Sequence, residues 1–386
     1  MRAGAIALLA CGAAVVVAAE FVVVGLVPAM TAELALSPGR IGLLVTLFAL
    51  GSAFLGPVLV AATARFSTST MLAAALVPFA ASLLLIPFPT FAAAAVLRVM
   101  QGAALTLFMS LAGAQMARAR GTGTGVALLY VGVTVGATLA PPIGTFSADR
   151  LGWEAPMAAI GAVALLVAAA CLALGDSEPT DRRGSSWRLL ACPSMRAHLL
   201  LSALLFAAMF TGFSYVALLL GRAGLEADAV TLALLGFGAA GLIGNWLAGV
   251  LARWALPATH GVALAVVAST AWLAVAAMPG AWTIGVAMLI WGIAHAAGFV
   301  SCQVRVMAAA PAAPSFAGAL NISAANIGIA VGSFAGGRAI ELGGYPALAG
   351  ATLALGLLSL ALAHRIVRTD PQWSPRQAPE EAVGRP

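Results

Sequence analysis

The stretch GDSEPTDRRGSSWRLLACPSMR, from Gly175 to Arg196, is the longest polar interruption in a chain of 386 residues that otherwise consists mainly of apolar runs. Six apolar runs precede it and six follow it, each bounded by proline, glycine or charged residues. A membrane-spanning helix needs about 20 mostly apolar residues. The pattern therefore predicts an all-α polytopic membrane protein with twelve transmembrane helices in two pseudo-symmetric six-helix bundles.

The predicted helices follow directly from these runs, which lie near residues 4–27, 41–63, 71–87, 91–115, 125–146, 155–174, 198–220, 229–251, 261–278, 281–306, 317–337 and 346–364. We expect a first bundle over residues 1–174 and a cytoplasmic linker over residues 175–196. A second bundle should occupy residues 197–364. The proline-rich, charged residues 365–386 should form a disordered cytoplasmic tail.

The composition excludes several classes of protein. Hydrophobic residues make up 62% of the chain, charged residues 8%, and the mean hydropathy is +1.05, whereas soluble domains carry about 25% charged residues. All 19 basic residues are arginine, so the chain has neither a P-loop lysine nor a Schiff-base lysine. It also lacks His-Glu-x-x-His and Gly-x-Ser-x-Gly motifs. We therefore expect no enzyme, no ATP-driven engine and no cofactor.

The cysteines and arginines exclude two further kinds of site. The four cysteines are scattered without any Cys-x-x-Cys spacing, which gives no support for a disulfide or a metal site. The arginines lie in short breaks between apolar runs and not in one basic patch, so nucleic acid is not an expected partner. The expected partner is the lipid bilayer.

The distribution of arginine predicts the orientation of the chain, because cytoplasmic loops carry an excess of basic residues. With the N-terminus inside, only Arg40, Arg150, Arg222 and Arg338 lie on the outer side, and Arg98 lies within a span. The cytoplasmic side then holds Arg2, Arg65, Arg118, Arg120, Arg182, Arg183, Arg188, Arg196, Arg253, Arg305, Arg365, Arg368, Arg376 and Arg385. This bias predicts a multi-pass protein of a bacterial inner membrane with both termini in the cytoplasm.

An internal repeat supports the division into two halves. The segment GPVLVAATAR, from Gly56, leads into the loop after the second run, and GNWLAGVLAR, from Gly244, leads into the loop after the eighth. Both end in Ala-Arg, at Arg65 and Arg253, and an aromatic residue follows each. Transporter folds are commonly built from such repeats.

Four segments resemble the major facilitator superfamily, and within it the drug:proton antiporter group that includes bacterial arabinose-efflux, purine-efflux and chloramphenicol-export permeases. They are AAEFVVVGLVP from Ala18, RVMQG from Arg98, GATLAPPIGT from Gly136 and ALNISAANIGIAVG from Ala319. The resemblance covers nearly the whole chain except the tail. It implies the major facilitator fold and a monomer that exchanges a small molecule for protons.

The segment from Gly136 is similar to the antiporter motif Gly-x-x-x-Gly-Pro-x-x-Gly. Gly136, Pro141 and Gly144 match the motif, and Ala140 replaces a glycine. Small residues at this spacing form a smooth groove on one helix face, and the prolines bend the helix. The motif has two interpretations that the sequence does not separate: helix packing alone, or a part in conformational coupling.

The loop between the second and third runs departs from the family pattern Gly-x-x-x-Asp-Arg-x-Gly-Arg-Arg. The chain reads VAATARFSTST, which keeps Arg65 but has Ala64 in place of the acid. That acid usually helps to close the cytoplasmic gate through charge pairs and helix-end interactions. The gate of this protein is therefore expected to close differently, or the transporter to be slow or uncoupled.

Glu20 is a single carboxylate within an apolar run. A charged residue at the centre of a membrane helix costs about 2.5 to 3.5 kcal/mol on insertion scales, which makes the group suited to taking up and releasing a proton. Glu20 and Arg98 each lie seven residues, about 10 Å at helical rise, from the outer end of their runs. We expect either an ion pair between them or direct contact of Glu20 with a cationic substrate; a static structural tie is the alternative.

Further polar and aromatic residues are candidates for the substrate site. Gln101 lies three residues after Arg98, on the same helical face. The second half has no Asp or Glu deep in a run, and its polar candidates are Asn245, His295, Gln303, Asn321 and Asn326. Aromatic side chains suitable for an apolar cage are Phe108, Tyr130, Phe210, Tyr215, Trp291 and Phe299. Helix packing is the alternative role for each of them.

These observations predict a secondary transporter that exports a small drug-like or metabolite molecule across the cytoplasmic membrane by proton antiport. The two bundles would rock around a site near the membrane midplane. An uncoupled facilitator or importer of a sugar or nucleobase is the alternative, in which Glu20 only binds substrate. The substrate itself does not follow from the sequence.

Overall fold

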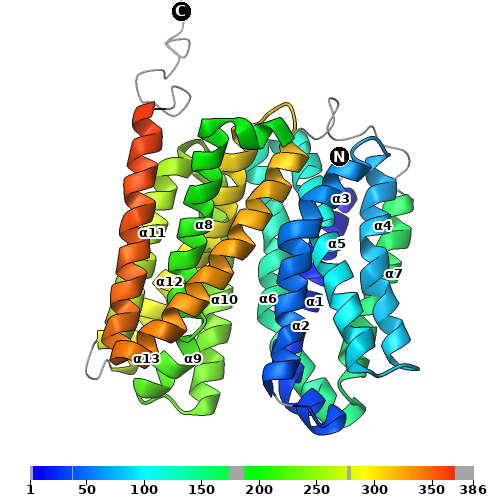
Figure 1. Ribbon diagram of the computed structural model, residues 1–386, viewed down its shortest axis with the longest axis horizontal. Coiled ribbons are helices and arrows are strands. Elements are labelled where there is room, and N and C mark those ends of the chain that lie inside the picture. The colour runs from blue at the N-terminus through cyan, green and yellow to red at the C-terminus, as the bar shows by residue number, and fades with distance from the viewer. Residues whose placement is uncertain (1–2, 37, 174–186, 276–279, 370–386) are drawn as a thin grey trace, which may run out of the picture.

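The computed structural model describes residues 3–36, 38–173, 187–275 and 280–369, and every regular element in these ranges is a helix. A backbone within lipid has no water to bond, so a chain this apolar satisfies its peptide groups within helices. Figure 1 shows two helical bundles side by side, with α6 and α10 at their boundary. The predicted all-α architecture is confirmed.

The first bundle contains α1 (Ala3–Leu34), α2 (Pro38–Leu50), the π-helix η1 (Gly51–Leu55), α3 (Gly56–Thr63), α4 (Thr68–Ala80), the 3-10 helix η2 (Ala81–Leu85), α5 (Phe91–Arg120), α6 (Thr122–Leu151) and α7 (Glu154–Leu172). The second bundle contains α8 (Pro193–Phe213), α9 (Val216–Arg222), α10 (Ala227–Val250), the 3-10 helix η4 (Ala252–Trp254), α11 (Ala255–Val275), α12 (Ala281–Ala308) and α13 (Pro314–Thr369). The short 3-10 helix η3 (Trp187–Ala191) precedes α8.

Eleven helical segments of the described residues are long and apolar enough to cross a membrane. The last of them, α13, is two helices joined by a sharp turn at Gly343 and Gly344. Gly344 has φ +65°, in the left-handed region that favours glycine. Each part of α13 exceeds the length of one span, so the predicted twelve spans are present.

The helix ends differ in detail from the predicted boundaries. The second part of α13 continues to Thr369, beyond the predicted end at residue 364. The predicted linker begins in residues 174–186, which lie outside the described residues, but η3 and the start of α8 at Pro193 occupy its second half. Of the predicted tail, residues 370–386 also lie outside the described part.

Large apolar side chains cover the outer surface of the bundles. Leu166 is 71% exposed, Phe334 72% and Trp282 83%. In a soluble protein so many exposed apolar groups would signal an interface or aggregation. In a chain that spans a membrane, these side chains face the lipid.

Glycines allow α6 to pack closely on α1. A Cβ atom added at Gly132 would collide with the carbonyl oxygen of Ala10, and one added at Gly136 with that of Ala14. At Gly144 the same atom would lie 2.9 Å from Cγ2 of Val22. The predicted motif face of α6 therefore packs on the helix that carries Glu20.

The second bundle repeats this arrangement. Added Cβ atoms at Gly328 and Gly332 of α13 would collide with the carbonyl oxygens of Ala203 and Ala207 of α8. The contact of α13 with α8 thus corresponds to the contact of α6 with α1. Both bundles hold their first and fifth spans together through backbone contact.

Replacing Gly136 with alanine tests this packing. Alanine normally stabilises a helix relative to glycine by about 0.5–1 kcal/mol, but at Gly136 the methyl group meets the Ala14 carbonyl and should destabilise the protein by about 1–3 kcal/mol. The matched control is Gly261→Ala in α11, where an added Cβ meets nothing within 4 Å. The midpoint temperature of thermal unfolding in detergent should fall for Gly136→Ala and stay level or rise for Gly261→Ala. Equal changes in the two variants would contradict the packing argument.

Candidate functional site

Arg98 ties three helices of the first bundle together. Its side chain is fully buried in α5. Its Nη1 donates to the carbonyl of Ala19 at 2.7 Å and its Nη2 to the carbonyl of Glu20 at 3.0 Å, both in α1. Its Nε donates to the carbonyl of Leu44 in α2 at 3.2 Å, and the guanidinium carbon lies 4.2 Å from the centre of the Phe48 ring. Hydrogen bonds and a cation–π contact therefore replace the water that this buried charge has lost.

Gln101 extends this network to a fourth helix. Its Oε1 accepts a bond from Arg98 Nη1 at 3.4 Å, while its Nε2 donates to Ser82 Oγ at 2.8 Å and to the carbonyl of Pro78 at 3.3 Å. Pro78 lies near the end of α4, where the chain changes to the 3-10 helix η2. Gln101 thus satisfies polar groups at this irregular point and fixes the orientation of Arg98.

The Glu20 carboxylate takes no part in these bonds. Arg98 contacts the backbone carbonyl of Glu20, and among the residues the structure describes no ion pair joins the two side chains. Glu20 is only partly buried. Of the two predicted arrangements, the ion pair is not formed in this conformation, and the carboxylate is left available for a proton or a ligand.

The second bundle also contains a buried arginine, and its burial does not follow from the sequence. Arg305 is expected on the cytoplasmic side at the end of the run 281–306, and it lies in the last turn of α12, where its side chain is fully buried. It donates to Nδ1 of His198 at 2.9 Å, to the His198 carbonyl at 3.0 Å and to Ser202 Oγ at 2.9 Å. This arginine ties α12 to α8 and does not contribute to a loop.

An aromatic cluster surrounds His295 in the second bundle. The imidazole centre lies 5.2 Å from the ring of Phe210, 4.6 Å from Phe213, 5.4 Å from Phe237 and 5.6 Å from Phe299. His295 is 7% exposed, and its Nδ1 has no hydrogen-bond partner. The chain thus places a polar nitrogen inside an apolar cage.

The cluster extends in two directions. Trp291 is fully buried, lies 6.0 Å from Phe237, and has no partner for its Nε1. Tyr130 of the first bundle lies 6.2 Å from Phe299. The cluster therefore reaches the boundary between the bundles.

Phe213 and Phe237 were not among the predicted site residues, and the sequence held a signal for part of the cluster. Phe206, Phe210 and Phe213 follow the spacing i, i+4 and i+7, and so share one face of α8. Trp291, His295 and Phe299 share a face of α12 in the same way. Phe237 carries no such signal, because only the packing of α10 brings it to this point.

Other predicted site residues lie elsewhere. Phe108 is buried inside the first bundle against Gly12. The hydroxyl of Tyr215 donates to the carbonyl of Ser333 at 2.8 Å, which ties the start of α9 to α13. Asn321 donates to Gln303 Oε1 at 2.7 Å within the second bundle. These contacts are structural ties between helices.

The predicted gate arginines contact aromatic neighbours in their own loops. The guanidinium carbon of Arg65 lies 5.0 Å from the centre of the Phe66 ring, and that of Arg253 lies 4.0 Å from the centre of the Trp254 ring. Ala64, at the end of α3, offers no charge to either. Within the described ranges, neither arginine forms an ion pair to the opposite bundle.

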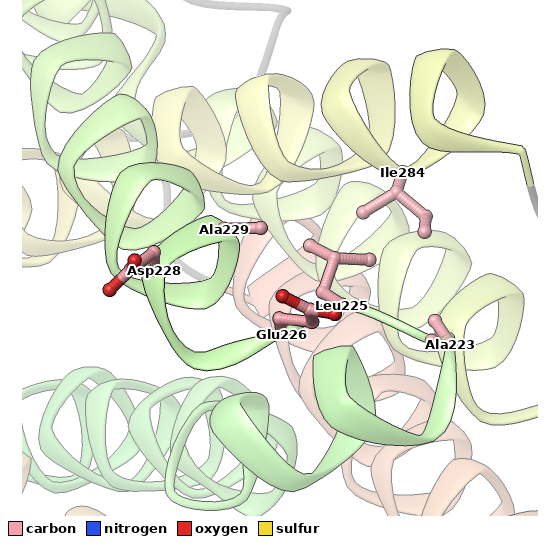
Figure 2. Close-up of a pocket in the computed structure, with 7 residues that line it drawn as sticks. Ala223, Leu225, Glu226, Asp228, Ala229 and Ile284 are labelled. Atoms are coloured by element: carbon pink, nitrogen blue, oxygen red, sulfur yellow. The ribbon is translucent and has the colours of Figure 1, made fainter.

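Figure 2 shows a shallow, open hollow at the far end of the second bundle, between the turn from α9 to α10 and the start of α12. The residues that line it are Ala223, Gly224, Leu225, Glu226, Asp228, Ala229 and Ile284. None of the predicted site residues is among them. We assign no function to this hollow.

The chain resembles known transporters over most of its length. A model of the Major Facilitator Superfamily matches residues 9–322. The proton:xylose symporter XylE, bound to 6-bromo-6-deoxy-D-glucose, superposes with a TM-score of 0.76 at 16% identity, over 95% of each chain. The human organic anion transporter MFSD10 has a TM-score of 0.70 at 18% identity, over 93% of this chain and 98% of its own. FucP in the outward conformation has a TM-score of 0.72 at 15% identity, over 94% and 98%.

The Arg98 network is tested by Arg98→Lys. A single ammonium group cannot bond α1, α2 and Gln101 at once, since it lacks the planar fork of the guanidinium. Hydrogen bonds to charged groups contribute about 1.5–3 kcal/mol each to stability. We expect the free energy of unfolding to fall by an amount in that range, which thermal unfolding in detergent would report. Arg120→Lys, at the exposed end of the same helix, is the control; similar small effects for both would disprove the tie.

Proposed function

The chain belongs to the major facilitator superfamily and is a membrane transporter of small molecules, and on that premise we propose that it exports a drug-like molecule from a bacterial cytoplasm in exchange for protons. The observation that carries the proposal is the Glu20 carboxylate: it is partly buried in α1 and forms no ion pair with Arg98, which contacts its backbone instead. An unpaired acid at membrane depth is a site where a proton and a cationic ligand compete.

Arg98 supplies a fixed positive charge beside Glu20. Its charge is fixed by carbonyl groups of α1 and α2 and by Gln101, so it stays in place whichever form Glu20 takes. Uptake or loss of a proton by Glu20 therefore changes the net charge of this site while Arg98 keeps its own. Deprotonated Glu20 then binds substrate from the cytoplasm, and a proton entering from outside displaces it.

The second bundle supports a substrate with an aromatic or apolar part. Its cluster of Phe210, Phe213, Phe237 and Phe299 carries no charge, and His295 and Trp291 each hold a nitrogen without a partner. Small-molecule sites are mostly apolar with a few polar groups that fix orientation. We infer a flat, partly aromatic substrate whose basic group faces Glu20.

A facilitator or importer of a sugar or nucleobase is the second candidate. It draws support from the absence of the usual acid at position 64 and from neighbours described as a proton:xylose symporter and a nucleoside transporter. The likeness to those neighbours, at 16% and 17% identity, extends to the fold alone. In this case Glu20 binds substrate without exchanging protons.

Reconstitution into proteoliposomes separates the two candidates. We expect proton movement on addition of an aromatic basic compound, and we expect Glu20→Gln to abolish it because the amide cannot ionise. Glu33→Gln, an exposed position in the same helix, is the matched control and should leave the signal intact. Sugar or nucleobase counterflow without proton movement, weakened in Glu20→Gln because substrate binding is lost, would establish the facilitator instead.

The aromatic contribution has its own test in Phe213→Leu. Aromatic pairs contribute about 0.5–1.5 kcal/mol beyond burial, so we expect a roughly 2- to 12-fold increase in the Kd of an aromatic substrate. Phe334→Leu, at an outward position of α13 that is 72% exposed, should not change binding. Equal affinities for both variants would remove the cluster from the substrate site.

A further inference from the structure

Two asparagine side chains of the second bundle donate hydrogen bonds to the first. Asn245 of α10 donates from Nδ2 to the Tyr130 carbonyl and to Thr134 Oγ1, both of α6 and both at 2.8 Å. Asn326 of α13 donates from Nδ2 to Ser52 Oγ of η1 at 3.2 Å. Polar side chains thus join the bundles at two separate places.

The two places lie between corresponding pairs of spans. Ser52 and Asn245 each follow a glycine, Gly51 and Gly244, at which an added Cβ would collide with a backbone carbonyl of α5 or α12. Their partners also correspond, since Tyr130 and Asn326 each lie two residues before a glycine of the face that packs on the first span of its own bundle. Both contacts therefore join the second span of one bundle to the fifth span of the other, with the donor amide on the second bundle in each case.

The contacts lie in a closed part of the interface. Near the arginine-rich end, an added Cβ at Gly123 of α6 would collide with Cβ of Ala252 and lie 2.8 Å from the carbonyl of Gly249. Further along, one at Gly241 of α10 would lie 3.3 Å from Cγ2 of Thr134. Asn245 is 1% exposed and Ser52 is fully buried. The bonds thus form where the two bundles touch and must break when they separate.

Ser52 is held in position by its own bundle. Its hydroxyl lies 2.9 Å from Thr106 Oγ1, which in turn donates to the Ser52 carbonyl at 3.1 Å. The local π-helix η1 frees backbone groups for such bonds, and π-turns are frequent at functional positions. Asn326 therefore docks onto a preformed acceptor.

We propose that Asn245 and Asn326 form a paired amide lock that holds the arginine-rich side of the transporter closed in place of the missing loop acid. The lock assigns a gating role to two residues for which the sequence suggested either a place in the substrate site or a role in helix packing. Its action depends on bundle separation alone and holds for antiport, symport or facilitated transport. It therefore stands apart from the proposed function.

The lock is weak enough to release. The Oδ1 atom of Asn245 is buried without a partner, so this contact is only half satisfied. Interhelical hydrogen bonds in membranes average about 0.6 kcal/mol, which is a threefold change in population for each bond. Three such bonds favour the closed state by a factor of about twenty, which still permits the bundles to part.

Distance measurements between spin labels test the lock in the absence of substrate and gradient. Labels on Arg120→Cys in the first bundle and on the exposed Cys192 in the second report separation at the arginine-rich end. We expect the population with widened distances to rise about threefold in Asn326→Ala and up to tenfold in Asn245→Ala. The other cysteines are replaced with serine in this background: Cys11, Cys171 and Cys302.

Asn321→Ala is the matched control, because Asn321 lies in the same helix as Asn326 but bonds Gln303 within its own bundle. It should leave the distances unchanged. Thr134→Val and Ser52→Ala remove hydroxyl partners on the first bundle and should widen the distances without adding to the effect of the corresponding asparagine variant. Equal distributions in all variants, or the same widening in Asn321→Ala, would overturn the lock.

Discussion

Direct contact between glycine faces and backbone carbonyls is the constraint on which this transporter depends. Lipid chains are as apolar as the side chains, so hydrophobic burial gives little drive for helices to associate, and close van der Waals packing must supply it. Gly132 and Gly136 bring α6 against α1, and Gly328 and Gly332 bring α13 against α8. Because the opposite face of α6 contacts α10, this helix connects the span that carries Glu20 with the second bundle.

The polar groups inside the first bundle fall into two sets, one that bonds the helices together and one that stays unpaired. Arg98 and Gln101 bond carbonyls and side chains of α1, α2 and α4, and a buried charge is tolerated because it is fully surrounded by acceptors. Glu20 is left out of the network although its own backbone carbonyl belongs to it. A fixed cation next to an unpaired acid provides a stable electrostatic setting in which the acid can change its protonation without dismantling the bundle.

The bundles are alike in packing and unlike in chemistry. Helix pairs and cross-bundle contacts recur by pseudo-symmetry, but the first bundle holds the arginine network beside Glu20, while the interior of the second has an aromatic cluster around His295 and the tie between Arg305 and His198. An interface with corresponding contacts on both sides of its axis is suited to rocking motion. Under the proposed function, this difference in chemistry would give charge exchange to one half and apolar recognition to the other.

The sequence by itself determined the twelve apolar spans, the division into halves and the type of residue at each candidate position, because span length, composition and glycine spacing are local properties of the chain. It also placed Trp291, His295 and Phe299 on one helix face. Only the tertiary structure decided that Arg98 bonds the backbone and not the carboxylate of Glu20, that Arg305 is buried, and that Asn326 reaches Ser52 in the other bundle. Such partners are far apart in the chain, and their meeting depends on how helices rotate and cross, which no single helix specifies.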